Sequence, residues 1–195
     1  MNKQTKTIAL IALFVLIIAI AVFAYNELSN KVSPQNNIGI AENNDETSQS
    51  VNNEETKKVK APDFTVLDAS GKAIKLSDFF GKPIVLNFWA SWCPPCKGEM
   101  PEFNEVYKQT GDSITFMMVD LVDGQRETKE KGYAYVKNQG FSFPVYFDTG
   151  QQAASAYGIS AIPTTIFIDK DGYIAGWAES AIDAETLQKG IDLIK

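Results

Sequence analysis

The two cysteines, Cys93 and Cys96, are the residues of this sequence best suited to redox chemistry. They are the only cysteines in the chain, and their spacing is C-x-x-C. A thiolate attacks a disulfide, and a second thiol three positions away can resolve the mixed disulfide that forms. The spacing therefore predicts thiol–disulfide exchange, with Cys93 attacking, Cys96 resolving, and a Cys93–Cys96 disulfide in the oxidised protein.

Other uses of this cysteine pair fit the sequence less well. A zinc site needs four ligands, and the chain has no histidine and no further cysteine to complete one. A purely structural disulfide over this spacing would close a very small loop and restrict the unfolded chain little. Two inert core cysteines remain a third alternative. We expect no metal and no cofactor, and the missing histidine also excludes Ser-His-Asp and Cys-His nucleophiles.

The elements around the cysteines explain why Cys93 is the better nucleophile. Residues 84–89 (IVLNFW) are almost entirely apolar, as in a central strand, and residues 94–109 have a helical pattern. Cys93 then lies where the strand passes into the helix, whose free amides and dipole favour a thiolate. Pro94 and Pro95 suit the first helical turn but donate no N–H, so Cys93 can accept backbone hydrogen bonds only from Cys96 onward.

The remaining elements predict an α/β fold. Strand and helix patterns alternate, which favours a central mixed sheet with helices on both faces. Ser70-Gly71 and Asp171-Gly172 mark two hairpins. The predicted strands are residues 64–67, 73–76, 84–89, 114–120, 145–148, 164–169 and 173–177, and the predicted helices are residues 94–109, 127–139, 151–157 and 183–194.

The N-terminal segment is predicted to place the rest of the chain outside the membrane. Residues 8–24 are 17 apolar residues without a charge, preceded by Lys3 and Lys6. This pattern predicts a membrane anchor over residues 1–25 with the N-terminus inside. A cleaved signal peptide is the alternative, although its apolar region is usually shorter and the only A-x-A pattern, at residues 19–21, lies inside the run.

Residues 26–60 are predicted to form a disordered linker between the anchor and a folded domain over residues 61–195. The segment is rich in polar residues and has no aromatic residue, so it cannot bury enough apolar area to offset the entropy of ordering. The domain would therefore work near the membrane surface. A net charge of −6 argues against a nucleic-acid partner.

Several motifs resemble one family. Residues 92–97 (WCPPCK), after residues 87–90 (NFWA), resemble the active site of thioredoxin-fold proteins. Motifs at residues 61–64, 76–78, 81–83, 99–101 and 162–165 are similar to the TlpA/ResA-like branch, membrane-tethered extracytoplasmic thiol–disulfide oxidoreductases. The resemblance covers nearly all of residues 61–195. It implies a thioredoxin-like fold with an N-terminal β-hairpin and a helix–strand insertion over about residues 127–148.

The resemblance also implies site residues beyond the cysteines. Pro163 would follow a cis peptide bond and face the cysteines, so that Ile162 offers its backbone to a bound partner. Trp92, Pro94 and Pro95 would contact the substrate as well. Glu99, three residues after Cys96 on the same helix face, would exchange a proton with Cys96; its alternative is a solvated helix charge.

Asn87 makes Glu99 the stronger candidate for proton transfer. Plain thioredoxins have a buried aspartate at the matching position, and an amide cannot titrate. Glu99 is then the remaining carboxylate that the motif offers for proton transfer. Residues 123–127 are predicted to form a loop and helix start, and the alternative is that they border the substrate groove. Phe141, Phe143, Tyr146 and Phe147 are predicted to pack in the core.

The resemblance implies a disulfide reductase acting on exported proteins, such as apocytochrome c or oxidised methionine sulfoxide reductase. An integral-membrane thiol–disulfide carrier would supply its electrons. The alternatives are a dithiol oxidase that installs disulfides, since C-x-x-C does not fix the reduction potential, and a non-catalytic adaptor. A peroxidase is disfavoured because Ala90 stands where a T-x-x-C site needs threonine.

Overall fold

The computed structural model of this protein describes residues 39–40 and 58–195. The predicted anchor at residues 1–25 and most of the predicted linker lie outside these residues. Among the residues that are described, no helix combines the length and the apolar character needed to cross a membrane.

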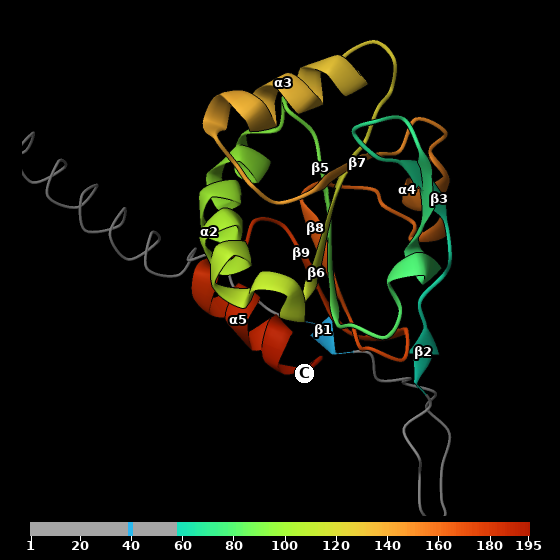
Figure 1. Ribbon diagram of the computed structural model, residues 1–195, viewed down its shortest axis with the longest axis vertical. Coiled ribbons are helices and arrows are strands. Elements are labelled where there is room, and N and C mark those ends of the chain that lie inside the picture. Colours follow the sequence, from blue (N-terminus) through green and yellow to red (C-terminus); the bar gives the residue numbers. More distant parts are fainter. Residues whose placement is uncertain (1–38, 41–57) are drawn as a thin grey trace, which may run out of the picture. The chain divides into compact units, whose positions relative to one another are not determined.

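A mixed β-sheet forms the centre of the fold, as the sequence predicts (Figure 1). Its strands lie in the order β1 (Gly39–Ile40), β9 (Tyr173–Glu179), β8, β5, β6, β7 (Val145–Phe147), β3 (Thr65–Leu67) and β4 (Ala73–Lys75), and β2 (Val59–Lys60) also pairs with β9. At its middle, β5 (Ile84–Trp89) pairs in parallel with β6 (Thr115–Asp120) and antiparallel with β8 (Thr164–Ile168). All six residues of β5 are buried, which is why this strand is apolar almost throughout.

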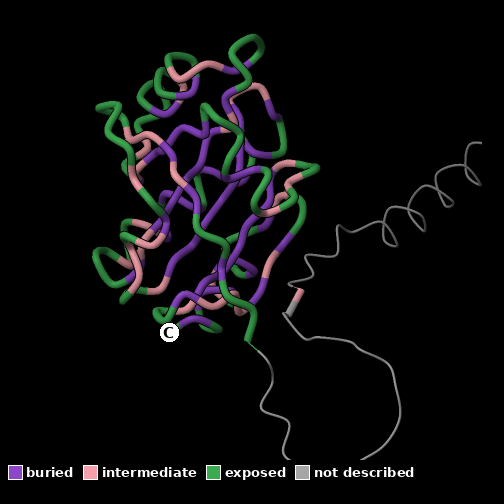
Figure 2. The backbone as a smooth tube through the Cα atoms, turned by 90° about the vertical axis from the view of Figure 1, so that its right-hand side faces the viewer, coloured by how far each residue is buried: buried purple, intermediate pink, exposed green. Residues whose placement is uncertain are grey.

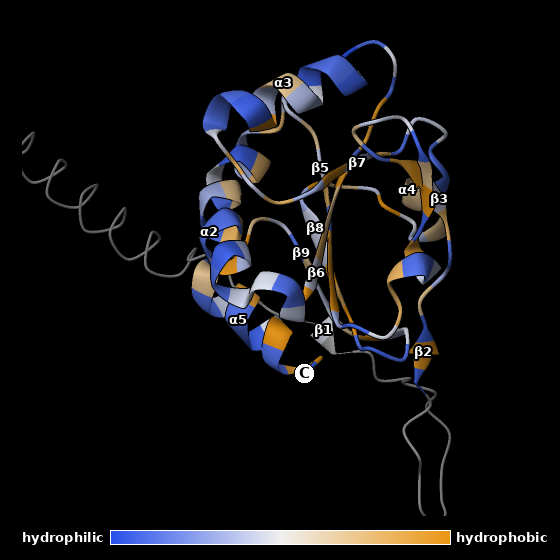
Figure 3. Ribbon diagram, viewed as in Figure 1, coloured by the Kyte–Doolittle hydropathy of each residue, from blue (hydrophilic) through white to orange (hydrophobic). Residues whose placement is uncertain are grey.

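Helices cover both faces of the sheet, because side chains along a strand alternate between faces. On one face, Val85 and Trp89 belong to the core that includes α2 (Pro94–Thr110) and α5 (Ala184–Asp192). On the other, Leu86 and Phe88 pack in the core that includes the 3₁₀ helix η1 (Leu76–Phe79) and α4 (Gln152–Ala156). Buried segments gather in the interior of the tube in Figure 2, and much of the ribbon of α2 is coloured hydrophilic in Figure 3.

The predicted hairpins are both present. β3 (Thr65–Leu67) pairs with β4 (Ala73–Lys75), and Asp68 Oδ1 accepts the N–H groups of Ser70 and Lys72 in the turn. β8 pairs with β9 (Tyr173–Glu179) across residues 169–172. Leu76 begins η1 instead of ending the strand, because Asp78 Oδ2 accepts the N–H of Lys75 at 2.9 Å and turns the chain there.

The expected helix–strand insertion is α3 (Lys129–Gln139) followed by β7 (Val145–Phe147), which extends the sheet beside β6. α3 begins two residues later than the predicted start at residue 127. Thr128 Oγ1 accepts the N–H of Lys131 at 3.3 Å and caps the helix. Glu127 consequently lies in the loop before α3, where it is free to contact another element.

Two very short strands fall within the range that the sequence assigns to the linker. β1 (Gly39–Ile40) and β2 (Val59–Lys60) both pair antiparallel with β9, at Gly176–Trp177 and at Tyr173–Ile174 respectively. Composition does not reveal these contacts, because they are made by backbone groups and a strand of two residues has no side-chain period to detect.

Candidate redox site

The two cysteines form a disulfide at the N-terminus of α2. Cys93 is the N-cap residue, and Cys96 lies in the first turn with Pro94 and Pro95 before it. Cys93 is 2% exposed and Cys96 is fully buried, whereas both prolines are exposed. The geometry therefore leaves Cys93 as the sulfur closer to solvent.

The helix start supplies one hydrogen bond to Cys93. The N–H of Cys96 lies 3.3 Å from Cys93 Sγ and donates to it. Pro94 and Pro95 have no N–H, so the first amide of α2 able to reach the sulfur is that of Cys96. In the reduced protein the same amide and the helix dipole would stabilise a Cys93 thiolate.

The Ile162–Pro163 peptide bond is cis, as the resemblance leads us to expect, and it faces Cys93. The carbonyl oxygen of Ile162 lies 3.7 Å from Cys93 Sγ. Thr164 Oγ1 donates to the carbonyl of Ala161 at 2.9 Å and closes the turn that carries this bond. The loop before β8 thus brings backbone polar groups to the reactive sulfur.

Glu99 is buried, with 3% of its surface exposed, so it is not a solvated helix charge. Its Oε1 accepts from Asn87 Nδ2 at 2.9 Å, and its Oε2 accepts from the N–H of Ile182 at 3.0 Å. Burial raises the pKa of Glu99 to about 7, although both hydrogen bonds oppose the shift. Glu99 can therefore gain or lose a proton near neutral pH.

Asn87 connects Glu99 to the strand that follows Pro163. Its Nδ2 also donates to Thr165 Oγ1 at 3.0 Å. Asn87, Glu99 and Thr165 thus link β5, α2 and β8 in one buried polar group behind the cysteines. The amide at position 87 does not titrate, but it orients the carboxylate that does.

Two further buried carboxyl groups were missed as site residues in the sequence. Asp120 ends β6 and is fully buried, and Glu127 in the loop before α3 is fully buried too. Glu127 Oε2 accepts both the N–H of Ser91 at 3.0 Å and Ser91 Oγ at 2.7 Å. The available signal was Asp120, an acid at the end of an apolar strand that runs parallel to the strand before Cys93.

The same loop contacts Trp92 next to the attacking cysteine. The guanidinium of Arg126 lies 3.5 Å from the centre of the Trp92 ring, in a cation–π contact. Residues 123–127 therefore do contact the active-site turn, through Arg126 and Glu127.

Within the described residues, no group of three or more histidine, cysteine or acidic side chains is arranged to hold a metal ion.

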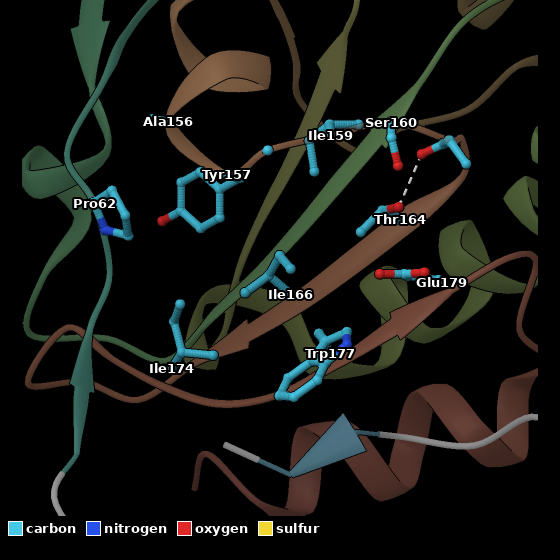
Figure 4. Close-up of a pocket in the computed structure, with 12 residues that line it drawn as sticks. Pro62, Ala156, Tyr157, Ile159, Ser160, Thr164, Ile166, Ile174, Trp177 and Glu179 are labelled. Carbon is cyan, nitrogen blue, oxygen red and sulfur yellow. Dashed lines mark hydrogen bonds between the residues drawn. The ribbon is translucent and has the colours of Figure 1, made fainter. Parts of the chain in front are cut away.

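A pocket of about 290 Å³ opens beside the Ile162–Pro163 loop (Figure 4). Ser160, Ala161 and Thr164 line the end near the loop, and Ile166 and Trp177 form an apolar wall from β8 and β9. Tyr157 lies on the opposite side, near Pro62, and Glu179 supplies a carboxylate. The pocket is mostly apolar with a few polar groups, which suits a side chain of a polypeptide.

Comparison with known proteins agrees with this geometry. Residues 58–176 match the AhpC/TSA family. The thiol-disulfide oxidoreductase ResA of Bacillus thuringiensis (strain Al Hakam) is 42% identical over 118 residues, which are 59% of this chain and 65% of that protein. The chain thus spans slightly less than two thirds of that relative. ResA of Geobacillus kaustophilus (strain HTA426) is 35% identical, over 69% of this chain and 76% of its own length.

The fold is thioredoxin-like. The crystal structure of StoA from Bacillus subtilis superposes with a TM-score of 0.59 at 28% identity, covering 67% of this chain and 97% of that one. The chain therefore belongs to the AhpC/TSA family and, within it, to the group of thioredoxin-fold proteins that includes the ResA thiol-disulfide oxidoreductases.

Proposed function

We propose that this protein is a membrane-tethered, extracytoplasmic thiol–disulfide oxidoreductase that reduces disulfides in exported proteins. One observation carries the proposal: the Cys93–Cys96 disulfide lies at the N-terminus of α2 with the Ile162 carbonyl 3.7 Å from Cys93 Sγ. A cysteine pair at a helix start has a nucleophile, a resolving thiol and a source of thiolate stabilisation.

The reaction begins with both cysteines reduced. The Cys93 thiolate attacks one sulfur of the substrate disulfide, forming a Cys93–substrate mixed disulfide and releasing the first substrate thiolate. The Cys96 thiolate then attacks Cys93 Sγ, which releases the second substrate thiolate and closes the Cys93–Cys96 bond. Two electrons pass from the protein to the substrate, and the substrate thiolates take up two protons.

Glu99 is the proposed base for the second step. Cys96 is fully buried and must lose its proton before it can attack, and Glu99 lies one helical turn further along α2. A carboxyl group with a pKa of about 7 accepts a proton at neutral pH and returns it when the disulfide is reduced again. The Asn87 and Ile182 hydrogen bonds hold the carboxylate in place.

The substrate is proposed to lie across Trp92, Pro94, Pro95 and Ile162. Both prolines are exposed next to Cys93, and the backbone of Ile162 is available beside the sulfur. An extended polypeptide could pair with that backbone as an added strand. The apolar pocket next to this loop would accept one of its side chains.

The proposed location of the folded domain and its proposed partners follow from the predicted anchor. With residues 1–25 in the membrane and the N-terminus inside, the folded domain would face outward. Its disulfide would be reduced again by an integral-membrane thiol–disulfide carrier. Apocytochrome c and oxidised methionine sulfoxide reductase are candidate substrates, because both are exported proteins with cysteines that must be reduced.

The test combines a potential with trapping in the full-length protein in detergent. A reduction potential well below about −220 mV would support a reductase, whereas one near −120 mV would identify a dithiol oxidase. Cys96→Ser should accumulate mixed disulfides with exported proteins, since nothing then resolves them. Cys93→Ser is the matched control and should trap nothing. If Cys93→Ser retains full cellular function, the protein is an adaptor and the proposal fails.

A further inference from the structure

Asp120 and Glu127 form a buried carboxyl pair that the proposed reaction does not use. Both residues are fully buried. Within the described part of the chain, three of their four oxygens, Asp120 Oδ1 and Oδ2 and Glu127 Oε1, have no hydrogen-bond partner. Buried carboxylates without partners are costly, so an arrangement of this kind needs an explanation.

The fourth oxygen connects the pair to the active-site turn. Glu127 Oε2 accepts from the N–H and the Oγ of Ser91 at 3.0 and 2.7 Å. Ser91 lies in a turn closed by the N–H of Cys93, which donates to the carbonyl of Ala90 at 3.1 Å. Glu127 thus holds the turn from which Cys93 projects, across 36 positions of sequence.

Gly132 on α3 shows how close the two carboxyl groups are. A Cβ atom at this position would lie 2.8 Å from Asp120 Cγ and 3.3 Å from Glu127 Oε1, and directly against Asp120 Oδ2. Both groups therefore face the same point, and only glycine leaves room for them. No cation is within hydrogen-bond distance of the unpartnered oxygens among the described residues.

The charged side chains around the pair do not offset the negative charge of the two carboxyl groups. Asp123 adds a third carboxylate nearby, and the cations of this region are engaged elsewhere. Lys131 Nζ donates to backbone carbonyls, Arg126 lies over Trp92, and Lys129 lies over Phe147. Burial together with the Glu127 and Asp123 carboxylates raises the pKa of Asp120 to about 9. Asp120 is consequently neutral at pH 7.

Several charged or titratable side chains surround the Asp120–Glu127 pair. The charged or titratable side chains of the loop before α3, of α3, of β7 with the residue that follows it, and of the active-site turn are Asp123, Arg126, Lys129, Glu130, Lys131, Tyr133, Tyr135, Lys137, Tyr146, Asp148 and the two cysteines. Asp148 is occupied by the N–H groups of Gln152 and Ala154. The cysteines are in their disulfide.

We propose that Glu127 is a positioning residue for Cys93, and that a proton on Asp120 is what lets the Glu127 carboxylate stay buried against the Ser91 turn. This inference rests on the proposed function, since it concerns the same attacking thiol. A neutral Asp120 can donate its proton towards Glu127 Oε1, which leaves one negative charge on the pair. When Asp120 ionises, two like charges share the buried site and the Ser91 turn loosens.

The test is the pH profile of Cys93 alkylation by iodoacetamide in the reduced, full-length protein. Beyond the ionisation of Cys93 itself, the unaltered protein should show a second rise in rate near pH 9, where Asp120 ionises. Asp120→Asn should abolish this second rise. Glu127→Gln should move it to lower pH, since Asp120 then faces one carboxylate fewer, and should raise the neutral rate about tenfold, as expected for losing a hydrogen bond to a charged group.

Glu130→Gln is the matched control, because Glu130 lies three residues further on and is exposed. Its profile should match that of the unaltered protein. Coincident profiles for Asp120→Asn and Glu130→Gln would overturn the proposal. Neither alkylation nor its pH profile needs a substrate, so a protein without reductase activity could still show the effect. Conversely, an active reductase with coincident profiles would overturn the positioning role alone.

Infrared spectroscopy of the unaltered protein keeps the proposal testable if a variant does not fold. A protonated carboxyl band should be present at pH 8, above the pKa of Glu99, and should disappear as the pH passes through about 9. The absence of that band at pH 8 would show that Asp120 is ionised and would overturn the proposal.

Discussion

Glu99 acquires its proton affinity from the balance of burial and two hydrogen bonds. Burial is the largest effect and raises its pKa, while the Ile182 N–H and the Asn87 amide lower it. The resulting pKa of about 7 is favourable, because a general acid or base is most effective when its pKa lies near the working pH. A solvent-exposed glutamate, with a pKa near 4.3, would hold almost no proton under the same conditions.

Replacing Glu99 tests its assignment as the base for Cys96. We expect Glu99→Gln to keep the fold and to slow reduction of a model protein disulfide by about 10²-fold, the usual contribution of general acid–base catalysis. The dependence of the rate on pH around 7 should also flatten. Turnover measured from pH 5 to 9 checks both. Unchanged rates over this range would exclude Glu99 from proton transfer.

Asn87 should tune Glu99 without titrating itself. Its amide lowers the pKa of Glu99, so Asn87→Ala is expected to raise that pKa above 7 and to move the pH–rate midpoint upward. Thr165→Val is a suitable control, because it removes the other partner of Asn87 and leaves the Glu99 bond in place. A midpoint that moves equally in both variants would mean that packing is responsible.

At this scale the sequence predicts local relations and misses distant ones. Cys93, Cys96 and Glu99 occur within seven residues, so their spacing on one helix indicates their proximity. The contact of Glu127 with Ser91 joins residues 36 positions apart and depends on where α3 begins. The pattern places Glu127 inside the helix, and this assignment conceals the contact.

At the scale of elements, the sequence predicts the bounds of the four α-helices to within two residues. Asp183 is predicted to begin the last helix, and its Oδ1 accepts the N–H of Thr186 at 2.8 Å before α5. α2 likewise ends within one residue of the predicted position. β1 and β2 were not predicted, because strands of two residues have no period to detect.

Two helical glycines should respond in opposite ways to alanine. A Cβ at Gly132 would meet the Asp120 carboxyl group, so Gly132→Ala should lower the free energy of unfolding by about 1–3 kcal/mol through overpacking. Gly98 on α2 has no neighbour within 4 Å of such an atom, and Gly98→Ala should add about 0.5–1 kcal/mol. Urea unfolding measures both. A neutral Gly132→Ala would mean that the carboxyl pair can move aside.

At the scale of the whole molecule, the two carboxyl groups with raised pKa values determine how the free energy of unfolding changes with pH. Glu99 and Asp120 bind protons more tightly in the folded state than in the unfolded chain. Their contribution to stability is therefore present at low pH and is lost as the pH rises through about 7 and about 9. The exposed Asp68 and Asp123 act in the opposite direction, because their lowered pKa values favour folding only above about pH 4.

We therefore expect the free energy of unfolding to fall between about pH 5 and pH 9. Asp120→Asn should reduce the slope over this whole range, and Glu99→Gln should reduce it only below about pH 7, because each variant removes one carboxyl group whose pKa is raised in the folded state. Urea denaturation at several pH values measures the slopes. A wild-type curve that rises from pH 5 to 9, or parallel curves for all three proteins, would contradict this prediction.

The short pairings of β1 and β2 also affect how copies of this protein behave when crowded. Unpaired strand edges invite other chains to add to a sheet, and β9 would otherwise be such an edge. Gly39–Ile40 and Val59–Lys60 already occupy its backbone at two places. At the opposite end, β4 has only three residues and ends in the exposed Lys75. The sheet is thus protected at both margins against edge-to-edge aggregation.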